Sequence, residues 1–538
     1  MSRRLRAGLS LLVLGSLITP LQIAKARPAA ADTLSGTISI NLSGNNQDVW
    51  QRLAADYEAL HPNVKVVVDL KPADSHYADY ISSGFAAGTP SFDLVFNNQN
   101  ASLLNAGKFL DFAPYLNQPD PYIGGKPWKD AIDLRAMLAT NGSNNHIYDL
   151  NLQTVQILWF YNKDIFQKVG ITQTPTTWNQ LLADCAKLKA AGYIPLGLAG
   201  DYNTLWGANG GWLFRMYADQ YTRSLVNDER SQPGDYTYDK TIDPAWKYNP
   251  ADPFNDDNNK VTTNPLRRLI AIQKSFNDSP DQAATDRWRV DSKPIQAVDQ
   301  NLHDLLSTYT PPGWYGITQD TAYSLFLQQK AAILLDGGWR LSAFEKDLKN
   351  LKLTKTSGAL KSFGFGSFNN PSMIGPLVQA PARTIEVAID FYGLAKKSFK
   401  QNKLNIDFLQ WFTSPAGYGK FIQYNVDSPN GSLTGPPVVK NVQLPPALQQ
   451  RYAAIKFVGN TEKAGTSGVG ARGFDDYQPS VRSWVNLVQQ YLSNKVTTQQ
   501  FATAEQQNVQ SNFENVVKFQ KYADSDLLTP AKQPPTRQ

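Results

Sequence analysis

Hydrophobic and polar residues alternate with two different periodicities near the start of the chain. Residues 37–42 alternate with a period of two, which predicts a strand, and residues 48–60 carry apolar side chains at helical spacing. Another apolar run, residues 64–70, predicts a second strand. Because a helix separates these two strands, we expect them to pair in parallel. A helix over 77–85 and a short buried strand over 92–96 extend the pattern.

A clear strand–helix signal lies between Leu158 and Gly192. Residues 157–161 form an apolar run that predicts a strand, and residues 164–169 predict a short helix. A longer helix follows, with apolar residues at i, i+3, i+4, i+7 and i+10: Trp178, Leu181, Leu182, Cys185 and Leu188. We expect Thr176 or Thr177 to cap its start and Gly192 to end it. A strand feeding a packed helix is typical of an α/β domain.

The composition fits a large globular protein. With 538 residues, 42% of them hydrophobic and 18% charged, the chain is long enough for two lobes of about 200 residues each. Cys185 is the only cysteine, so an intrachain disulfide is excluded. Its place on the apolar face of a predicted helix favours a buried, unreactive thiol.

The N-terminal segment has the features of a secretion signal. Arg3, Arg4 and Arg6 precede a short apolar run, residues 9–18, and small residues ending at Ala26 or Ala31 offer cleavage sites. The apolar run is shorter than the ~20 residues of a membrane span. No cysteine lies near either site, so no lipid anchor is expected. We therefore expect residues 1–31 to be a signal peptide and the mature protein to be periplasmic or extracellular.

The positive charge of the chain belongs mostly to this segment. Residues 1–31 contain five basic residues and no acidic one, so their removal would lower the net charge from +6 to +1. A nearly neutral chain lacks the excess of positive charge that is typical of nucleic-acid-binding proteins.

No motif for catalysis, metal or cofactor binding stands out. The four histidines lack metal-ligand spacing, and HExxH, GxSxG and Walker patterns are absent from the sequence. Residues 468–473 fit GxGxxG but do not follow a strand of a βαβ unit. The acidic residues between Asp252 and Asn258 lack the glycine and the closing acid of a calcium loop. We predict no catalytic residue, no metal site and no cofactor.

Several segments resemble one protein family. The run from Leu158 to Gly192, LWFYNKDIFQKVGITQTPTTWNQLLADCAKLKAAG, resembles the "YNKDxFxKxGI…PxTWxxL…KLKxxG" stretch of the family 1 extracellular solute-binding proteins. These are the maltose-binding-protein-like receptors that feed ABC importers. Residues 84–98, 104–116, 322–340 and 406–431 resemble further segments of the family, with Gln329 where the family usually has glycine.

The resemblance implies an α/β, two-lobed periplasmic-binding-protein fold of type II. Each lobe would hold a parallel-rich sheet flanked by helices, with crossing segments as the hinge. We expect the segments to alternate along the chain: lobe I at 32–152 and 365–428, lobe II at 153–364 and 429–538, the last of these helical. The polar, irregular stretch at about 219–312 is interpreted as an insertion in lobe II.

Amide-rich loops are the first candidate ligand contacts. Open parallel sheets bind ligands beyond the carboxyl ends of their strands. The loops after the first and third predicted strands contain Asn45, Asn46, Asn97 and Asn98. Amides both donate and accept hydrogen bonds, which suits hydroxyl groups. Asparagine also marks ordinary turns, so this second interpretation stays open.

Aromatic and acidic residues complete the candidate site. Trp339 follows two glycines at a position that is a common stacking residue in the family, and Trp206 lies in a glycine-rich stretch. Trp212 is a further candidate, with core packing as the alternative. Asp149 and Gln153 precede the strand at 157–161, where the family chain first crosses between lobes. Asp149 would either accept bonds from sugar hydroxyls or brace the hinge.

These features predict an extracytoplasmic receptor that captures a neutral sugar or oligosaccharide between two lobes. Aromatic faces would stack on the apolar face of a sugar ring, and amides would bond its hydroxyls. The closed, monomeric form would then dock on ABC transporter permease subunits. Two alternatives remain: a secreted glycoside hydrolase, which needs a pair of acids at one cleft, and a surface or signalling receptor without a transporter.

Overall fold

The computed structural model describes most of the chain. The described residues are 34–71, 76–96, 103–104, 106–134, 147–235, 238, 240–241, 243–249, 264–277, 286–353, 361–453, 455–456, 458–461 and 473–529. The predicted signal peptide, the segment 252–258 and residues 468–472 therefore lie outside them.

The first sheet confirms the predicted strand–helix–strand unit. Strand β1 (Gly36–Ile40) pairs in parallel with β2 (Val64–Val68) and with β3 (Leu94–Phe96). Strand β9 (Tyr392–Leu394) is antiparallel to β3 and completes the order β2-β1-β3-β9. Helix α1 (Gln47–Leu60) buries its apolar stripe, although Leu60, which the spacing places inward, is 54% exposed. This sheet and its helices form the first lobe.

The second sheet differs from the prediction in strand direction. Its order is β5-β6-β4-β7, built from β5 (Ile194–Gly197), β6 (Ala331–Gly337), β4 (Gln153–Asn162) and β7 (Phe365–Phe368). Only β5 and β6 pair in parallel among these strands, whereas β4 is antiparallel to both β6 and β7. The expectation of a parallel-rich sheet is thus right for the first lobe and wrong for the second. The reason is that β4 enters the second sheet from the first lobe, against the direction of β6.

The segment that follows β4 folds as its sequence predicts. Helices α5 (Lys163–Lys168) and α6 (Trp178–Ala190) occupy the expected places. Thr177 is the N-cap of α6, and Thr177 and Gln180 form a reciprocal capping box. Cys185 is fully buried, and this burial raises the pKa of its thiol well above the ordinary range.

The polar stretch at 219–312 is largely helical where it is described, so the expectation of an irregular stretch is wrong there, and its interpretation as an insertion stays a prediction. It contains the end of α8 (Asn209–Thr222), then α9 (Val226–Glu229), α10 (Pro265–Asn277) and α11 (Lys293–Tyr309). Helix α11 buries Val298, Leu302 and Leu305 in the core of the second sheet. Its hydrophobic face is spaced for a helix, and the polar composition of the surrounding stretch obscured it.

The remaining helices cover the two sheets. They are α2 (Tyr77–Ala86), α4 (Ala113–Leu116), α7 (Tyr202–Gly207), α12 (Gln319–Leu327), α13 (Arg340–Leu353), α14 (Phe399–Phe412), α15 (Pro415–Asp427), α16 (Pro446–Ala453), α17 (Gln478–Leu492), α18 (Thr498–Phe519) and α19 (Asp524–Leu527). The short strand β8 (Glu386–Ile389) pairs with the start of β4. Short 3-10 helices lie at Pro121–Ile123, Trp128–Ala131, Arg223–Leu225, Asp243–Ala245, Asp286–Trp288, Trp314–Gly316 (η6) and Phe474–Asp476.

Two predicted segment boundaries disagree with the pairing and packing. Strand β7 pairs with β4 in the second sheet, so the chain has not yet returned to the first lobe at residue 365. Leu433, Val439 and Leu448 belong to the core of the first lobe, so the chain has not left that lobe at residue 429. The Phe/Gly alternation of 363–368 predicts a strand but contains no information on which sheet it joins. The division of the chain into lobes otherwise stays a prediction.

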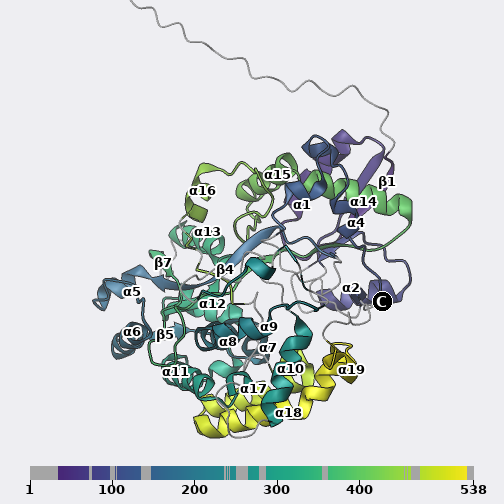
Figure 1. The fold of residues 1–538 in the computed structure, drawn as a ribbon. Helices are drawn as coiled ribbons and strands as arrows, with labels where there is room; N and C mark the ends of the chain where they lie inside the picture. The colour runs from purple at the N-terminus through teal and green to yellow at the C-terminus, as the bar shows by residue number, and fades with distance from the viewer. Residues whose placement is uncertain are drawn as a thin grey trace, which may run out of the picture.

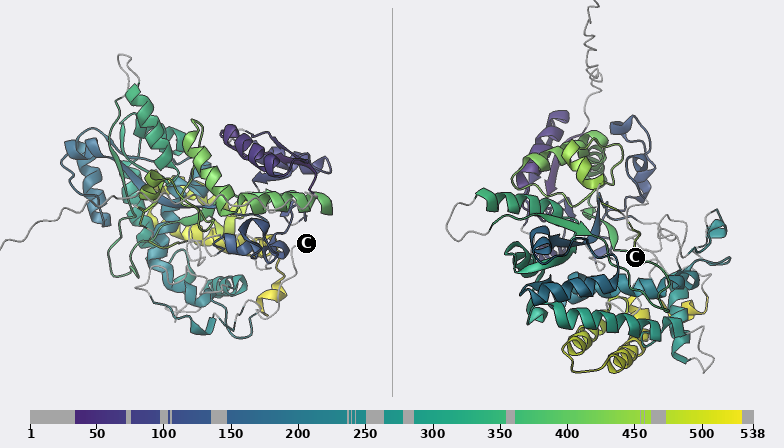
Figure 2. Two further views of the ribbon diagram at one scale, coloured as in Figure 1. Left: turned by 90° about the horizontal axis from the view of Figure 1, so that it is seen from above. Right: turned by 90° about the vertical axis from the view of Figure 1, so that its left-hand side faces the viewer.

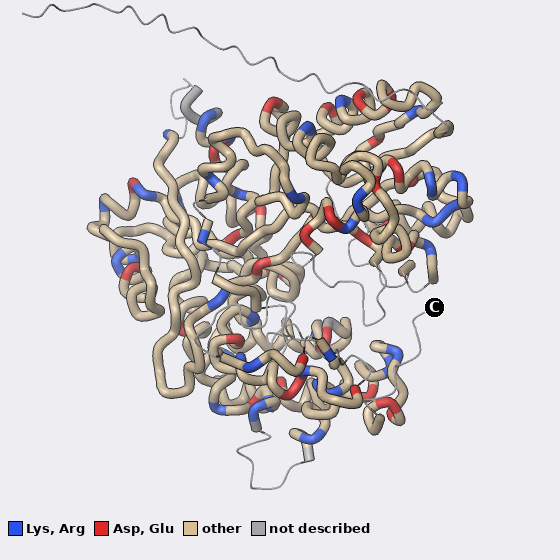
Figure 3. The backbone as a smooth tube through the Cα atoms, turned by 45° about the horizontal axis from the view of Figure 1, so that its top comes forward, with Lys and Arg blue, Asp and Glu red and all other residues tan. Residues whose placement is uncertain are grey.

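The arrangement in space is two bodies joined by β4. Figure 1 shows β1, α1, α14 and α15 together at the top, and α8, α11, α17 and α18 together at the bottom, with β4 running between them. In the right-hand view of Figure 2 the C-terminal helices α17 and α18 lie on the outer side of the second lobe. Acidic and basic residues are interspersed along the described chain (Figure 3). Within that part of the chain, no helix has the length and apolarity that a membrane span requires.

Candidate ligand-binding site

Strand β4 is shared between the two lobes. Its first residues, Gln153 to Gln156, pair with β8, and its later residues, Ile157 to Asn162, pair with β6 or β7. Just before β4, Leu150 forms a bridge with Tyr392 of the first sheet. The first half of β4 therefore lies at the crossing between the lobes, where a hinge is expected.

Gln153 ties three crossing segments together. Its Nε2 donates to Asp390 Oδ2 at 2.5 Å, and its Oε1 accepts from the backbone N of Thr434 at 3.0 Å. Thr434 Oγ1 also donates to Asp390 Oδ2, at 3.4 Å. Asp390 lies between β8 and β9 with a φ of 69°, and burial raises the pKa of its carboxyl to about 6. We define Gln153, Asp390 and Thr434 as the crossing tie.

Asp149 is nearly fully buried beside the same crossing. It is 3% exposed, and Asn151, two residues further along, is fully buried. A carboxylate in this position either braces the crossing or meets a solute only at the very base of the gap between the lobes. The contact of Asp149 with a ligand stays a prediction.

Three buried amides near β4 have an oxygen without a hydrogen-bond partner among the described residues. These are the side chains of Asn151, Gln156 and Asn209. Gln156 donates to Asn369 Oδ1 at 2.7 Å, and Asn209 donates to the backbone O of Leu335 at 2.7 Å. Since buried polar atoms are normally satisfied, these oxygens need water or a ligand. The sequence analysis missed these amides because nothing in the local pattern marks them as buried.

A group of tryptophans lies on the second lobe. The ring of Trp212, on α8, packs edge-on against the ring of Trp339, with centroids 6.0 Å apart and planes at 66°. Trp212 is only 7% exposed and belongs to the core, whereas Trp206 and Trp339 are partly exposed and pack against the same core cluster. We define Trp206, Trp212 and Trp339 as the tryptophan group.

The turn that carries Trp339 is firmly held. A Cβ at Gly337 would lie 2.2 Å from the indole of Trp339, so only glycine allows the ring to fold back here. The carboxylate of Asp336 accepts from the backbone N of Gly337 at 2.8 Å and from Nε of Arg340 at 2.6 Å. The backbone N of Gly338 donates to the backbone O of Gln156 at 2.8 Å. These contacts place the Trp339 turn beside the crossing half of β4.

The loop asparagines predicted to contact the ligand are not brought to the crossing where they are described. Asn45 is exposed after β1. Asn46 begins α1 without a side-chain cap bond, and its Nδ2 donates instead to Asn425 Oδ1 on α15 at 3.1 Å. Asn97 and Asn98 lie outside the described residues. The structure thus brings Gln153, Asp149 and Trp339 near the crossing but gives Asn46 a partner within the first lobe.

No metal centre is visible in the part of the chain that the structure describes. It contains no group of three or more His, Cys, Asp or Glu side chains placed to hold an ion.

Two sheets joined by a shared strand, with tryptophans and amides beside the crossing, define a two-lobed binding protein of the type II periplasmic fold. The chain belongs to the family of bacterial extracellular solute-binding proteins, whose sequence model matches residues 43–419. Proteins of this family are solute-binding receptors rather than enzymes, and this assignment replaces the glycoside hydrolase alternative.

Individual relatives are distant. A binding protein of Brucella abortus strain 2308 is 24% identical over 257 residues, which cover 44% of this chain and 57% of that relative. The chain therefore spans little more than half the length of this relative.

Similar structures cover nearly the whole chain. One from a study of xylan utilization by Caldanaerobius polysaccharolyticus has a TM-score of 0.56 at 16% identity, covering 88% of this chain and 100% of the other. The solute-binding protein RafE in complex with raffinose has a TM-score of 0.53 at 17% identity, covering 87% and 98%. A chitin oligosaccharide binding protein has a TM-score of 0.55 at 16% identity, covering 89% and 99%. At these identities the likeness establishes the fold.

Proposed function

We propose that this protein binds a neutral sugar or oligosaccharide between its lobes and delivers it to an ABC importer. The tryptophan group beside the crossing carries the proposal. A partly exposed indole, held in place by Gly337 and Asp336, offers a flat apolar face for a sugar ring.

Several similar structures support the solute class. They are a protein in complex with raffinose, a chitin oligosaccharide binding protein and a protein with bound maltose. The fold is shared with this chain, and its aromatic and amide side chains fit the same chemistry. Export through a cleaved signal peptide and docking on membrane permease subunits are parts of this proposal.

The proposed mechanism is hinge closure. A solute that contacts both lobes only in the closed form stabilises that form by its difference in affinity for the two states. The crossing tie keeps the three crossing segments in contact while the lobes move. The chain performs no chemistry on the solute.

The direct test is calorimetry on the mature protein with mono-, di- and oligosaccharides. Trp339→Ala is expected to weaken binding of the best sugar at least tenfold, about 1.4 kcal/mol, because it removes the stacking face. Phe399→Ala is the matched control, since this ring is 80% exposed on α14 of the first lobe. Equal affinity of the Trp339 variant and the wild type would mean that the site is wrongly placed.

A receptor without a transporter would bind the same solute. The two roles differ in cells: deletion of the gene abolishes uptake of the bound sugar in an importer system and leaves uptake intact in a purely signalling one.

A further inference from the structure

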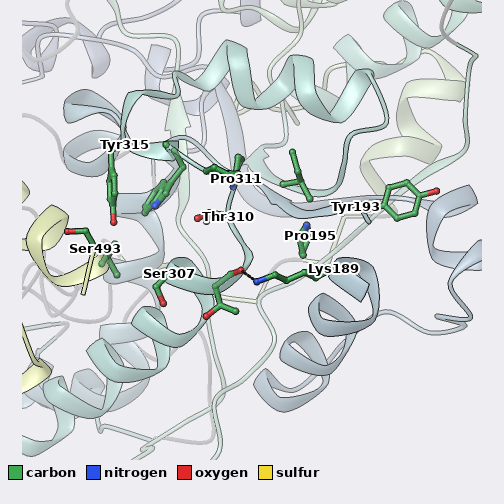
Figure 4. Close-up of a pocket in the computed structure, with 14 residues that line it drawn as sticks. Lys189, Tyr193, Pro195, Ser307, Thr310, Pro311, Tyr315 and Ser493 are labelled. Carbon is green, nitrogen blue, oxygen red and sulfur yellow. Dashed lines mark hydrogen bonds between the residues drawn. The ribbon is translucent and has the colours of Figure 1, made fainter. Parts of the chain in front are cut away.

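A cavity of about 440 Å³ opens on the second lobe, away from the crossing. It is enclosed by the C-terminal ends of α6, α11 and α17, by the start of β5 and by the 3-10 helix η6 (Figure 4). None of its lining residues belongs to the crossing tie or to the tryptophan group. Its volume lies within the range of small-molecule sites, about 300–1,000 Å³.

The inner wall of the cavity is apolar and partly aromatic. Pro195, Pro311 and Leu492 are buried there. The rings of Trp314 and Tyr315 lie 5.1 Å apart with planes at 34°. Tyr315 stands at one end of the cavity (Figure 4). Tyr315 is the partly exposed ring of the two, so it offers the contact area to the apolar face of a flat or ring-shaped ligand, and the buried Trp314 packs behind it.

This aromatic wall is fixed in place before any ligand arrives. Trp314 is 3% exposed, and its ring occupies the space that a Cβ at Gly200 would need, with a closest approach of 2.1 Å. The backbone N of Gly200 in turn donates to the backbone O of Ile317 at 3.1 Å. A ligand would therefore meet a preformed surface, which lowers the entropic cost of binding.

The polar rim of the cavity is rich in hydrogen-bond acceptors. Three lining hydroxyls have already donated their protons to helix carbonyls. Ser307 donates to His303 O at 2.6 Å, and Thr310 donates to Leu306 O at 2.6 Å. Ser493 donates to Gln489 O at 2.7 Å. Each hydroxyl oxygen is left with a lone pair, so the rim favours a ligand that brings its own donors.

Charge narrows the ligand class further. Among the described residues that line the cavity, Lys189 is the only charged one and none is a carboxylate. Its Nζ already donates to the backbone O of Thr308 at 3.0 Å, as the dashed line in Figure 4 marks. An anion would meet mostly acceptors, and a cation would meet no acid. A neutral ligand with several hydroxyl groups and one apolar face satisfies both the wall and the rim.

We propose that this cavity is a second carbohydrate-binding site, which takes one or two neutral sugar rings on the outer side of the second lobe. This second site goes beyond the proposed function, because the cavity lies outside the gap between the lobes. All its lining residues belong to elements of the second lobe, so its binding does not depend on hinge closure.

Saturation-transfer NMR on the mature protein tests the proposal. The probes are methyl β-glucoside, maltose, raffinose and diacetylchitobiose, and the protein carries Trp339→Ala so that binding between the lobes is weakened. At least one probe is expected to give a transfer signal that falls at least fivefold on adding Ser493→Trp, which places an indole at the mouth of the cavity. Tyr315→Ala, which removes one side of the wall, is expected to have the same effect.

Ser511→Trp is the matched control, because Ser511 is an exposed serine on α18 outside the cavity. It should leave the signal unchanged. Loss of all transfer signal in Trp339→Ala alone, or a signal insensitive to both cavity variants, would overturn the second site. Either of these results leaves the proposed function standing if calorimetry detects binding in the wild type. The opposite result would overturn the proposed function alone. In that case the cavity variants remove all sugar binding, whereas Trp339→Ala leaves the affinity unchanged.

Discussion

Single residues in this protein show how backbone geometry places a functional side chain. Gln329 adopts the left-handed conformation, with a φ of 58°, in the turn before β6. This conformation costs a residue with a Cβ some strain, which a glycine would avoid. At Gly337 the requirement is steric instead, because the indole of Trp339 occupies the position of a Cβ.

A buried acid on α18 gives a residue-scale prediction. Glu505 is 3% exposed, and burial raises the pKa of its carboxyl to about 8. It accepts from Asn508 at 3.3 Å, and Asp299 of α11 adds a like charge. The nearby groups on α11 and α17 include Asp304, His303 and Tyr491. Because the unfolded carboxyl ionises near its ordinary value, the folded state loses stability as the pH rises toward 8.

Glu505→Gln is expected to remove most of this loss. Between pH 6 and pH 9 the wild type should lose about 2–3 kcal/mol more of its unfolding free energy than the variant. Urea unfolding at both pH values measures the difference. Glu514→Gln, at an exposed position of the same helix, is the control. An identical pH dependence in wild type and Glu505→Gln would show that the Glu505 carboxyl is already ionised at pH 6.

At the scale of elements, the crossing tie joins segments that are remote in sequence. Gln153 is 237 residues from Asp390 and 281 from Thr434, yet one amide bonds both. Helix α8 is anchored in a similar way: the carboxylate of Asp219 accepts from Arg223 and from Arg383, both at 2.6 Å, and all three side chains are buried. Arg383 lies shortly before β8, so this ion pair fixes the second lobe against the crossing.

Gln153→Leu tests whether Gln153 holds the crossing tie together or contacts the ligand. If Gln153 serves the crossing tie, the ligand-free protein loses about 1–3 kcal/mol of stability, because Asp390 loses its amide donor and keeps only the longer bond from Thr434 Oγ1. The loss should be larger at pH 8 than at pH 5. Below a pKa of about 6 the carboxyl of Asp390 is mainly protonated and has no buried charge to stabilise.

The control for this change is Gln423→Leu. Gln423 makes the same kind of bond, to Asp427 Oδ1 at 2.8 Å, on the exposed surface of α15. Thermal unfolding at both pH values and calorimetry with the sugar give the two readouts. Unchanged ligand-free stability together with lost affinity would assign Gln153 to the ligand rather than to the tie.

At the scale of the whole molecule, β4 and β8–β9 join the two lobes, and the proposed hinge closure would turn the lobes about this crossing. We predict that saturation with the bound sugar lowers the radius of gyration in solution scattering, because closure brings the lobes together. Trp339→Ala at the same sugar concentration should keep the larger value of the ligand-free protein. Binding without compaction in the wild type would contradict hinge closure.

Much of the local structure follows from the sequence alone. The apolar periodicity of residues 48–60 and the capping signal at Thr177 predict α1 and α6, and both helices form there. The sequence resemblance likewise leads to the family and the two-lobed fold. Helical spacing and caps are local properties, so they are readable without knowing the neighbours of a segment.

The tertiary structure alone decided which distant segments meet. It placed β7 in the second sheet, gave Gln153 the partners Asp390 and Thr434, and set Trp212 against Trp339. It also gathered the ends of α6, α11 and α17 around a cavity. The reason is physical: periodicity records that one face of a segment is buried, whereas the partner that buries it is chosen by strand pairing, packing and charge across hundreds of residues.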